Sequence, residues 1–352
     1  MGTVPSVAGA LTPQQCSQSA DAIAAVQRPS GAIPWFDGGR LDPWDHVQAA
    51  MALAAAGRVE DSARAYEWSR LNQRSDGSWA IRYLDEDVED PHTDSNFCAY
   101  LATGVWHHWL VTGDRAFVDR MWTAVARGIE VTLDMQRPDG AVAWARAAGR
   151  PEPEALVTGN ASIHLSLRCA LALAALVGDM RPDWELAAAR LRHALDDHPE
   201  LFAAKATHAM DWYYPLLGGS LPRGTAGELL DERWDEFVVP GLGVRCVSTN
   251  PWVTGAETCE LVLALDVAGR ADDAREQLAS MQHLRDADGS YWTGLVYDED
   301  VRWPVERTTW TAATVILAAD ALSRTTPANG LFRGEGLPAC TWKASDACPC
   351  PR

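Results

Sequence analysis

Two kinds of helical segment alternate along the chain: one is amphipathic, and the other is apolar on nearly every face. The amphipathic segments are predicted to lie outside, at 13–27, 59–73, 115–136, 183–197, 226–235 and 272–283. The apolar segments are predicted to lie inside, at 43–56, 91–111, 156–177, 205–217, 251–268 and 304–322. Six such pairs predict an all-α fold, an (α/α)6 toroid of six helical hairpins. The only plausible extended run is 237–247.

A short phrase with Gln, Gly and Trp recurs where outer segments end. A fixed phrase between helices indicates copies of one supersecondary unit stacked around a shared core. Segment 79–91 also matches segment 292–304 without a gap, with Trp, Asp-Glu-Asp-Val and Pro in equivalent places. We therefore predict one toroidal domain over 12–325, an N-terminal arm at 1–11, and a Cys/Pro-containing tail at 326–352 that frays after Ala328. The phrases are Gln27 to Gly31 with Trp35, Gln73 to Gly77 with Trp79, Gln136 to Gly140 with Trp144, and a weaker copy from Arg285 to Trp292.

Charge and hydropathy narrow the choice of partners. The 352-residue chain carries a formal charge of −18, which repels phosphate backbones, so nucleic acid is not an expected partner. No run reaches the 18 or more apolar residues of a membrane helix, and the first residues do not resemble a signal peptide. We expect a cytoplasmic protein with no stable membrane span and a small-molecule substrate.

The first turns of the inner helices are predicted to line one mouth of the ring, and carboxylates are frequent there. Glu257 and Glu260 lie in an otherwise apolar segment, where an unpaired acid is costly unless it pairs with an arginine such as Arg245 or takes part in chemistry. Capping of helix N-termini is an equally good explanation for Asp45 and Asp94. The predicted catalytic residues are Glu257, Glu306, Asp94 and Asp211. The predicted substrate-binding residues are Trp44, Asp45, His46, Asn160, His164, Trp212, Tyr213, Trp252, Glu260 and Trp310.

Other chemistries find little support in the sequence. The inner histidines lie on different units without the spacing of metal ligands, and there is neither a phosphate-binding loop nor a nucleophile elbow. The tail cysteines Cys340, Cys348 and Cys350 have no nearby histidine, and their role stays open. We expect no metal and no cofactor, and acid/base chemistry by carboxylates.

The repeated phrases resemble the QW motifs of terpenoid cyclases, and the predicted ring is similar to that of cyclases and protein prenyltransferase β subunits. Blocks at 210–215, 241–246 and 303–310 resemble an actinobacterial prenyltransferase-like group. The resemblance covers roughly 12–325 and implies an isoprenoid-type substrate processed by carboxylates. The Asp-x-Asp-Asp element of proton-initiated cyclases does not occur in this sequence.

Two other functions fit the same residues. The (α/α)6 ring also serves glycoside hydrolases, lyases and sugar epimerases, so the fold does not select the chemistry. Sixteen tryptophans against six phenylalanines favour stacking on sugars, and opposed carboxylates such as Asp94 and Glu306 suit glycosidic chemistry. A carbohydrate-active enzyme is therefore the first alternative, and a non-catalytic scaffold is the second.

Overall fold

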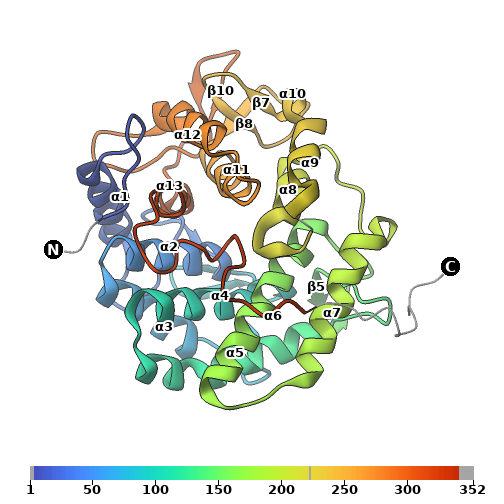
Figure 1. Cartoon of the computed structure of the whole chain (residues 1–352). Helices are drawn as coiled ribbons and strands as arrows, with labels where there is room; N and C mark the ends of the chain where they lie inside the picture. Colours follow the sequence, from blue (N-terminus) through green and yellow to red (C-terminus); the bar gives the residue numbers. More distant parts are fainter. Residues whose placement is uncertain (1–3, 222, 341–352) are drawn as a thin grey trace.

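The computed structural model describes residues 4–221 and 223–340, which form two concentric rings of helices (Figure 1). This confirms the predicted toroid of six helical hairpins. The inner ring contains α2 (Pro43–Ala55), α4 (Ser95–Thr112), α6 (Val157–Val177), α8 (Ala209–Tyr213), α11 (Gly255–Val267) and α13 (Thr309–Ser323). The outer ring contains α1 (Pro13–Val26), α3 (Val59–Leu71), α5 (Arg115–Leu133), α7 (Pro182–Asp197), α9 (Ala226–Glu232) with α10 (Trp234–Phe237), and α12 (Ala271–Ser280).

The apolar and amphipathic patterns correspond to the two rings. Every residue of α2 and of α11 is buried, whereas outer helices such as α5 bury one face. The fourth inner helix, α8, is much shorter than its predicted range of 205–217, because Pro215 has no N–H to continue the helical ladder. The chain proceeds as a 3-10 segment (Tyr214–Gly219), in which Gly218 adopts φ +72° against the side chain of Leu165.

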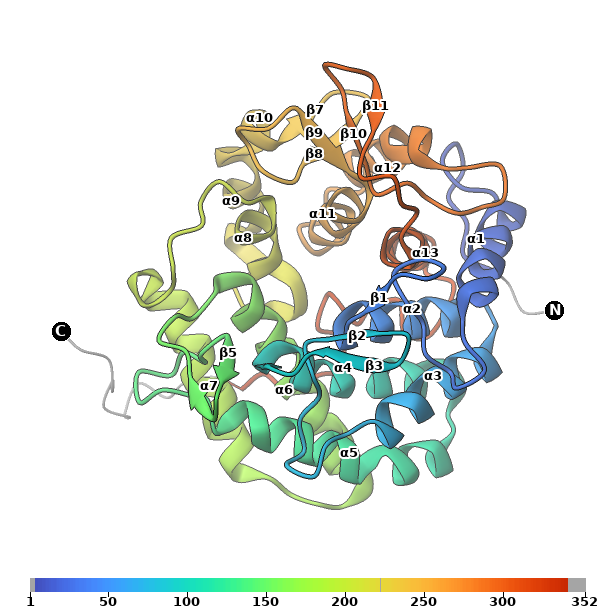
Figure 2. The ribbon, with the colours of Figure 1, turned by 180° about the vertical axis from the view of Figure 1, so that it is seen from behind.

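Short strands lie on one face of the ring, in the loops that lead from outer to inner helices (Figure 2). They were not predicted outside 237–247, because strands of two to four residues are too short to show an alternating pattern. All pairings are antiparallel, and three of them join strands of neighbouring units. The matching segments 79–91 and 292–304 both form hairpins. The first is β2 (Arg82–Leu84) with β3 (Asp87–Asp90), and the second is β10 (Gly294–Val296) with β11 (Val301–Arg302).

The strands make three sheets. The first contains β1 (Arg40–Leu41), β2 (Arg82–Leu84) and β3 (Asp87–Asp90), and the second contains β4 (Thr93–Asp94), β5 (Ala145–Ala147) and β6 (Arg150–Pro151). The third contains β7 (Val238–Val239), β8 (Gly243–Arg245), β9 (Trp252–Thr254), β10 (Gly294–Val296) and β11 (Val301–Arg302).

The glutamine of each full phrase joins two neighbouring units. The Nε2 atom of Gln27 donates to the carbonyl of Gly31 at 3.1 Å and to that of Asp61, on the next outer helix, at 2.9 Å. Gln73 makes the same two bonds to Gly77 and to α5, and Gln136 makes them to Gly140 and to α7. We call this pair of hydrogen bonds the Gln clip.

The glycine of the phrase permits the close approach that the clip requires. Gly31 has φ +98°, and a Cβ atom there would lie 2.1 Å from the carbonyl oxygen of Arg64 on α3. In the weaker copy, a Cβ atom at Gly289 would lie 2.6 Å from the backbone carbonyl of Gln18 on α1. The last unit therefore closes against the first. The tryptophans are less uniform: Trp79 is buried and donates to the carbonyl of Ser69, whereas Trp35, Trp144 and Trp292 are partly exposed.

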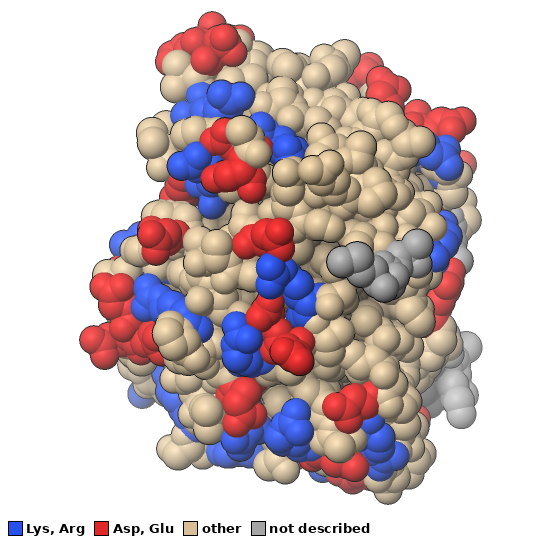
Figure 3. Space-filling view, turned by 90° about the vertical axis from the view of Figure 1, so that its left-hand side faces the viewer, with Lys and Arg blue, Asp and Glu red and all other residues tan. Residues whose placement is uncertain are grey.

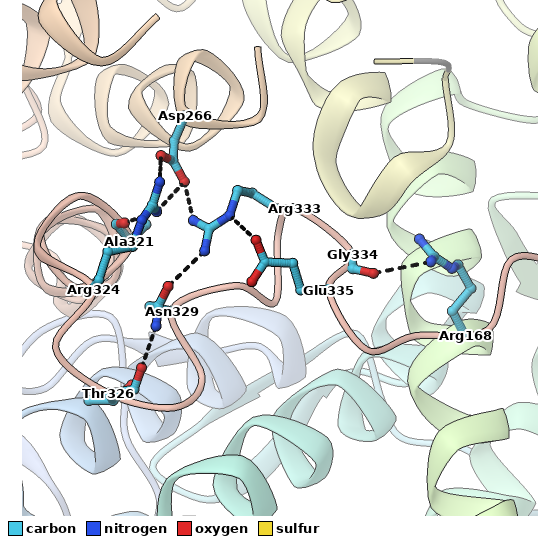
Figure 4. Close-up of polar contacts among 9 residues, drawn as sticks. All are labelled: Arg168, Asp266, Ala321, Arg324, Thr326, Asn329, Arg333, Gly334 and Glu335. Atoms are coloured by element: carbon cyan, nitrogen blue, oxygen red, sulfur yellow. Dashed lines mark hydrogen bonds and ion pairs between the residues drawn. The ribbon is translucent and has the colours of Figure 1, made fainter. Parts of the chain in front are cut away.

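The C-terminal segment crosses the end of the ring opposite to the strands (Figures 1 and 4). Asp266, at the end of α11, accepts from Arg324 at 2.7 Å and from Arg333 at 2.5 Å. On the other side of the ring, Arg168 of α6 donates to the carbonyls of Gly334, Leu337 and Pro338. The expectation that the tail frays after Ala328 is wrong for this segment, because Leu331 and Phe332 are buried in the core.

Charges on the outside of the ring alternate in sign. On the side shown in Figure 3, Lys and Arg side chains are interspersed with Asp and Glu. Within the described residues, α6 is long and apolar enough to cross a membrane, but 78% of its apolar window is buried inside the ring. The length and composition of α6 are therefore those of a core helix.

The Gln clip can be tested through its glycine. Replacing Gly31 by Ala combines an unfavourable positive φ with a clash against backbone, so we expect a loss of roughly 3 kcal/mol or more in unfolding free energy. Gly57 is the matched control, because its φ is +84° but open space surrounds it. Gly57→Ala should cost only the backbone strain, about 1 kcal/mol. Equal losses in urea unfolding would show that the contact with α3 contributes nothing.

Candidate functional site

The first turn of α2 is fixed by the residue that caps it. Asp42 Oδ1 accepts from the backbone N–H groups of Trp44 and Asp45, both at 2.9 Å, and Oδ2 accepts from the Trp35 indole at 2.6 Å. Asp42 therefore takes the capping role that the sequence analysis offered for Asp45. The carboxyl group of Asp45 itself shares a side-chain hydrogen bond with that of Asp42.

Asp45 lies among three further carboxylates in the mouth of the ring. Burial raises the pKa of Asp45 well above its ordinary value, and the charges of Asp42, Glu260 and Glu257 raise it further. Asp45 and Glu257 come from the first turns of two different inner helices, α2 and α11. Only 6% of Asp45 and 5% of Glu257 is exposed to solvent. Burial and these neighbouring charges therefore favour the protonated form of Asp45, which suits a proton donor.

Glu260 lies one helical turn deeper than Glu257 on α11. Its Oε2 atom accepts a hydrogen bond from the Tyr213 hydroxyl at 2.8 Å. Burial raises the pKa of Glu260 to about 8, Glu257 adds to this rise, and the bond from Tyr213 opposes it. Glu260 is therefore largely neutral at pH 7, which limits the negative charge beneath Glu257.

Aromatic rings pack beneath and beside the carboxylates. The ring of Trp44 lies 5.6 Å from Tyr100, 6.3 Å from Tyr214 and 5.7 Å from Trp310, measured between centroids. In the described part of the chain, the indole N–H groups of Trp44 and Trp310 have no hydrogen-bond partner. Buried donors without partners are unusual, and a bound polar ligand is one way to satisfy them.

Spacing along the inner helices explains which residues reach the mouth. Asp45 and Glu257 both stand three residues after the N-cap of their helix, and Gln48, Tyr100 and Glu260 stand six residues after it. Residues three apart share one face of a helix, so these positions form one stripe toward the ring axis. The sequence analysis missed Asp42, Gln48, Tyr100 and Tyr214 as site residues. Aligning the six helices on their N-caps would have found Gln48 and Tyr100.

Residues four positions after the N-cap turn toward the loops instead. His46 Nδ1 accepts from the backbone N–H of Ile33 at 3.1 Å, and its Nε2 lies 2.9 Å from the carbonyl of Ala65. Burial lowers the pKa of His46 to about 4, so the ring is neutral. Asn160 has the same place on α6 and bonds the N–H and the carbonyl of Val142. The structure thus gives both residues bonds to the phrase loops.

The remaining predicted residues have their own contacts outside the four-carboxylate cluster, although the charge of Asp42 also acts on Asp94. Asp94 caps α4 through the N–H of Phe97, and burial raises its pKa to about 7. Asp211 accepts from Thr158 at 2.6 Å, and His164 bonds Ser220 deep in the ring. Trp212 is buried, stacks on Phe237 and donates to the carbonyl of Leu229. Trp252 lies at the rim on β9.

Glu306 is on the outer side of α13. It lines a cavity of about 540 Å³ between α1 and the loops before α13, together with Asp21, Asp37, Asp288 and Trp292. This is the largest cavity described, but it does not include Asp45, Glu257 or Glu260. Burial raises the pKa of Glu306, and no described contact joins it to Asp94. That the two acids oppose each other across the mouth stays a prediction.

Metal ligands do not gather anywhere in the described residues: no group of three or more His, Cys, Asp or Glu is placed to hold an ion. Arg245, the suggested partner of Glu257, bonds Tyr297 and the carbonyl of Glu236 instead. Cys340 is partly buried, whereas Cys348 and Cys350 lie outside the described residues.

The fold compares well with solved carbohydrate-active proteins. A wild-type glycosidase matches with a TM-score of 0.68 and 16% identity, over 91% of this chain and 97% of that one. A D-mannose isomerase matches with a TM-score of 0.66 and 9% identity, over 87% and 96%. Cellobiose 2-epimerase from Spirochaeta thermophila gives 0.60 and 11%, over 89% and 98%. At such identities these matches establish the (α/α)6 fold alone.

A sequence relative is far more similar. No family model matches the chain. The MMP endo-(1,4)-3-O-methyl-alpha-D-mannosidase of Mycolicibacterium hassiacum is 60% identical over 338 residues, which are 96% of this chain and 94% of the relative. This relative, together with the (α/α)6 fold, indicates a carbohydrate-active enzyme of glycosidase type. The chain belongs to the family of that mannosidase.

This finding corrects the resemblance drawn from the repeated phrases. The prenyltransferase-like and terpenoid-cyclase-like assignment, and the isoprenoid substrate that it implied, are wrong. The first alternative, a carbohydrate-active enzyme, has the support instead. The physical reason is visible in the Gln clip, because the glutamine and glycine of the phrase join neighbouring units of a ring.

Burial of Glu260 predicts a pH-dependent contribution to stability. Between its ordinary pKa of 4.5 and its folded pKa of about 8, the folded protein holds a proton that the unfolded chain has lost. Unfolding free energy therefore falls as pH rises through this range, by up to about 1.4 kcal/mol per unit of pKa difference. Glu260→Gln cannot lose that proton and should gain stability relative to wild type from pH 5 to pH 9.

Urea unfolding of both proteins at several pH values measures this difference. Glu276→Gln, on the exposed face of α12, is the control and should track the wild type at every pH. A constant difference between Glu260→Gln and wild type would mean that Glu260 does not hold a proton in the folded state.

Proposed function

We propose that this protein is an endo-acting glycoside hydrolase that cleaves α-1,4 bonds between 3-O-methylmannose units. The 60% identity to the Mycolicibacterium hassiacum mannosidase over nearly its whole length carries the choice of substrate. The presence of Asp45 and Glu257 in one cluster supports hydrolysis, because glycosidic cleavage uses two carboxyl groups, one as acid and the other as base or nucleophile.

Asp45 is the proposed general acid. Its raised pKa favours the protonated carboxyl, whose proton passes to the glycosidic oxygen as the bond to the anomeric carbon breaks. The departing sugar leaves as an alcohol, and Asp45 is left ionised. The N-terminus of α2, to which Asp45 belongs, favours the negative charge that then develops.

Glu257 is the proposed second carboxylate. It comes from the first turn of α11, which α13 separates from α2 in the inner ring, and it reaches the same cluster as Asp45. As a base it takes a proton from the water that attacks the anomeric carbon; as a nucleophile it attacks that carbon itself. NMR of the first anomer released separates the two roles, since a single displacement inverts the configuration and a double displacement retains it.

Two substitutions test the assignment. Asp45→Asn and Glu257→Gln should each lower kcat on the methylmannose polymer by about 10² to 10⁴ with little change in thermal midpoint. Glu306→Gln, at the separate cavity, should stay within about threefold of wild type. Release of new reducing ends is the readout, because isomerisation or epimerisation produces none. Full activity of Asp45→Asn or Glu257→Gln would remove that residue from the mechanism.

The acid and its partner differ in their response to the leaving group. An activated aryl glycoside departs without protonation, so Asp45→Asn should regain most of the wild-type rate on a dinitrophenyl methylmannoside. Glu257→Gln should remain slow on it. The opposite result would exchange the two roles. A wild-type protein that releases no reducing ends from the polymer would favour the non-catalytic scaffold.

A further inference from the structure

Two tryptophans meet at the rim of the mouth, above the start of α11. Trp252 opens strand β9, which leads directly into the helix that carries Glu257, and Trp303 follows β11 (Figure 2). Their ring centroids are 5.1 Å apart at an interplanar angle of 74°. The Trp252 indole N–H donates to the backbone carbonyl of Trp303 at 2.9 Å, which fixes one ring against the other strand.

The position of Trp252 also depends on a glycine. Its indole crosses strand β10 at Gly294, where a Cβ atom would lie 2.5 Å from Trp252 Nε1. The ring is therefore seated on the sheet and held by backbone contacts on two sides. A fixed aromatic surface loses little conformational entropy when a ligand covers it.

The same rim exposes an unusual amount of apolar surface. Trp303 is 52% exposed and Val305, two residues later, is 86% exposed. The two tryptophans border an open recess of about 330 Å³, which Asn250, Pro251, Val296 and Glu299 complete. Clustered apolar side chains beside a binding site commonly mark a surface that a ligand covers.

We propose that Trp252 and Trp303 form a platform that binds the substrate chain beyond the cleaved bond. The proposal rests on the function proposed above and assigns the rim a chain-length preference. The occupant is a methylated mannose oligosaccharide: its C–H and methyl-ether faces contact the two rings, and its hydroxyl groups reach Glu299 and Asn250. The platform adjoins the carboxylate cluster along the polypeptide, because β9 begins at Trp252 and leads directly into α11, whose first turn contains Glu257.

Chain length is the discriminating variable. Trp303→Ala removes the ring but keeps the backbone carbonyl to which Trp252 donates. On a long methylmannose polymer, kcat/KM should fall about tenfold, mainly through KM. On the shortest oligosaccharide that the wild type cleaves, kcat/KM should stay within about twofold. Met180→Ala, 71% exposed in the connection from α6 to α7, is the matched control and should change neither value.

Binding without turnover gives a second measurement. In the Asp45→Asn background, calorimetry should show weaker polymer binding after Trp303→Ala and equal affinity for the short oligosaccharide. Equal losses on both substrates, or no loss on the polymer, would overturn the platform while leaving the proposed hydrolysis intact. If the wild type forms no reducing ends from either substrate, the proposed function fails first. Matching thermal midpoints show that Trp303→Ala is folded.

Discussion

The Gln clip is the interaction on which the ring depends. Each full phrase places one side-chain amide between its own glycine and the next outer helix, so every clip sets both a distance and an angle between neighbouring units. The glycines allow backbone to touch backbone, which a side chain would prevent. Because Gly289 meets α1 in the same way, small errors cannot accumulate into an open solenoid. The closed ring then brings the N-termini of six inner helices to one face.

That convergence explains how four carboxylates coexist in a nearly closed mouth. Asp42 is stabilised by two backbone N–H groups and the Trp35 indole, while Asp45 and Glu257 lie in first turns, where the helix dipole favours negative charge. Burial opposes ionisation and raises the pKa values of Asp45 and Glu260, while the hydrogen bonds to Asp42 oppose the rise in its pKa. Depth and capping thus set how strongly these acids favour their protons.

The sequence predicted the ring because its signals are local. Apolar runs identified α2, α6, α11 and α13, and acids inside an apolar segment identified Glu257 and Glu260. The strands outside 237–247 could not be predicted, because each spans only two to four positions. Three of their pairings also join residues from different units. His46 and Asn160 look like mouth residues in the sequence, but four positions after an N-cap the side chain faces the loop. Which face a residue takes depends on where its helix begins, and Asp42 determines that start for α2.

The ring architecture explains both why the family resemblance was misleading and from which side a substrate can reach the mouth. Ring closure needs the Gln clip whatever reaction the mouth performs, so the phrase carries no information about substrate. The opposite end of the ring is crossed by the segment that Asp266 and Arg168 hold (Figure 4). Under the proposed function, a polymer has access from the strand-bearing face alone and lies across the mouth, since it cannot thread the ring. Cleavage within a chain needs such a path, and the proposal places the residues that choose the substrate at the rim and in the first turns.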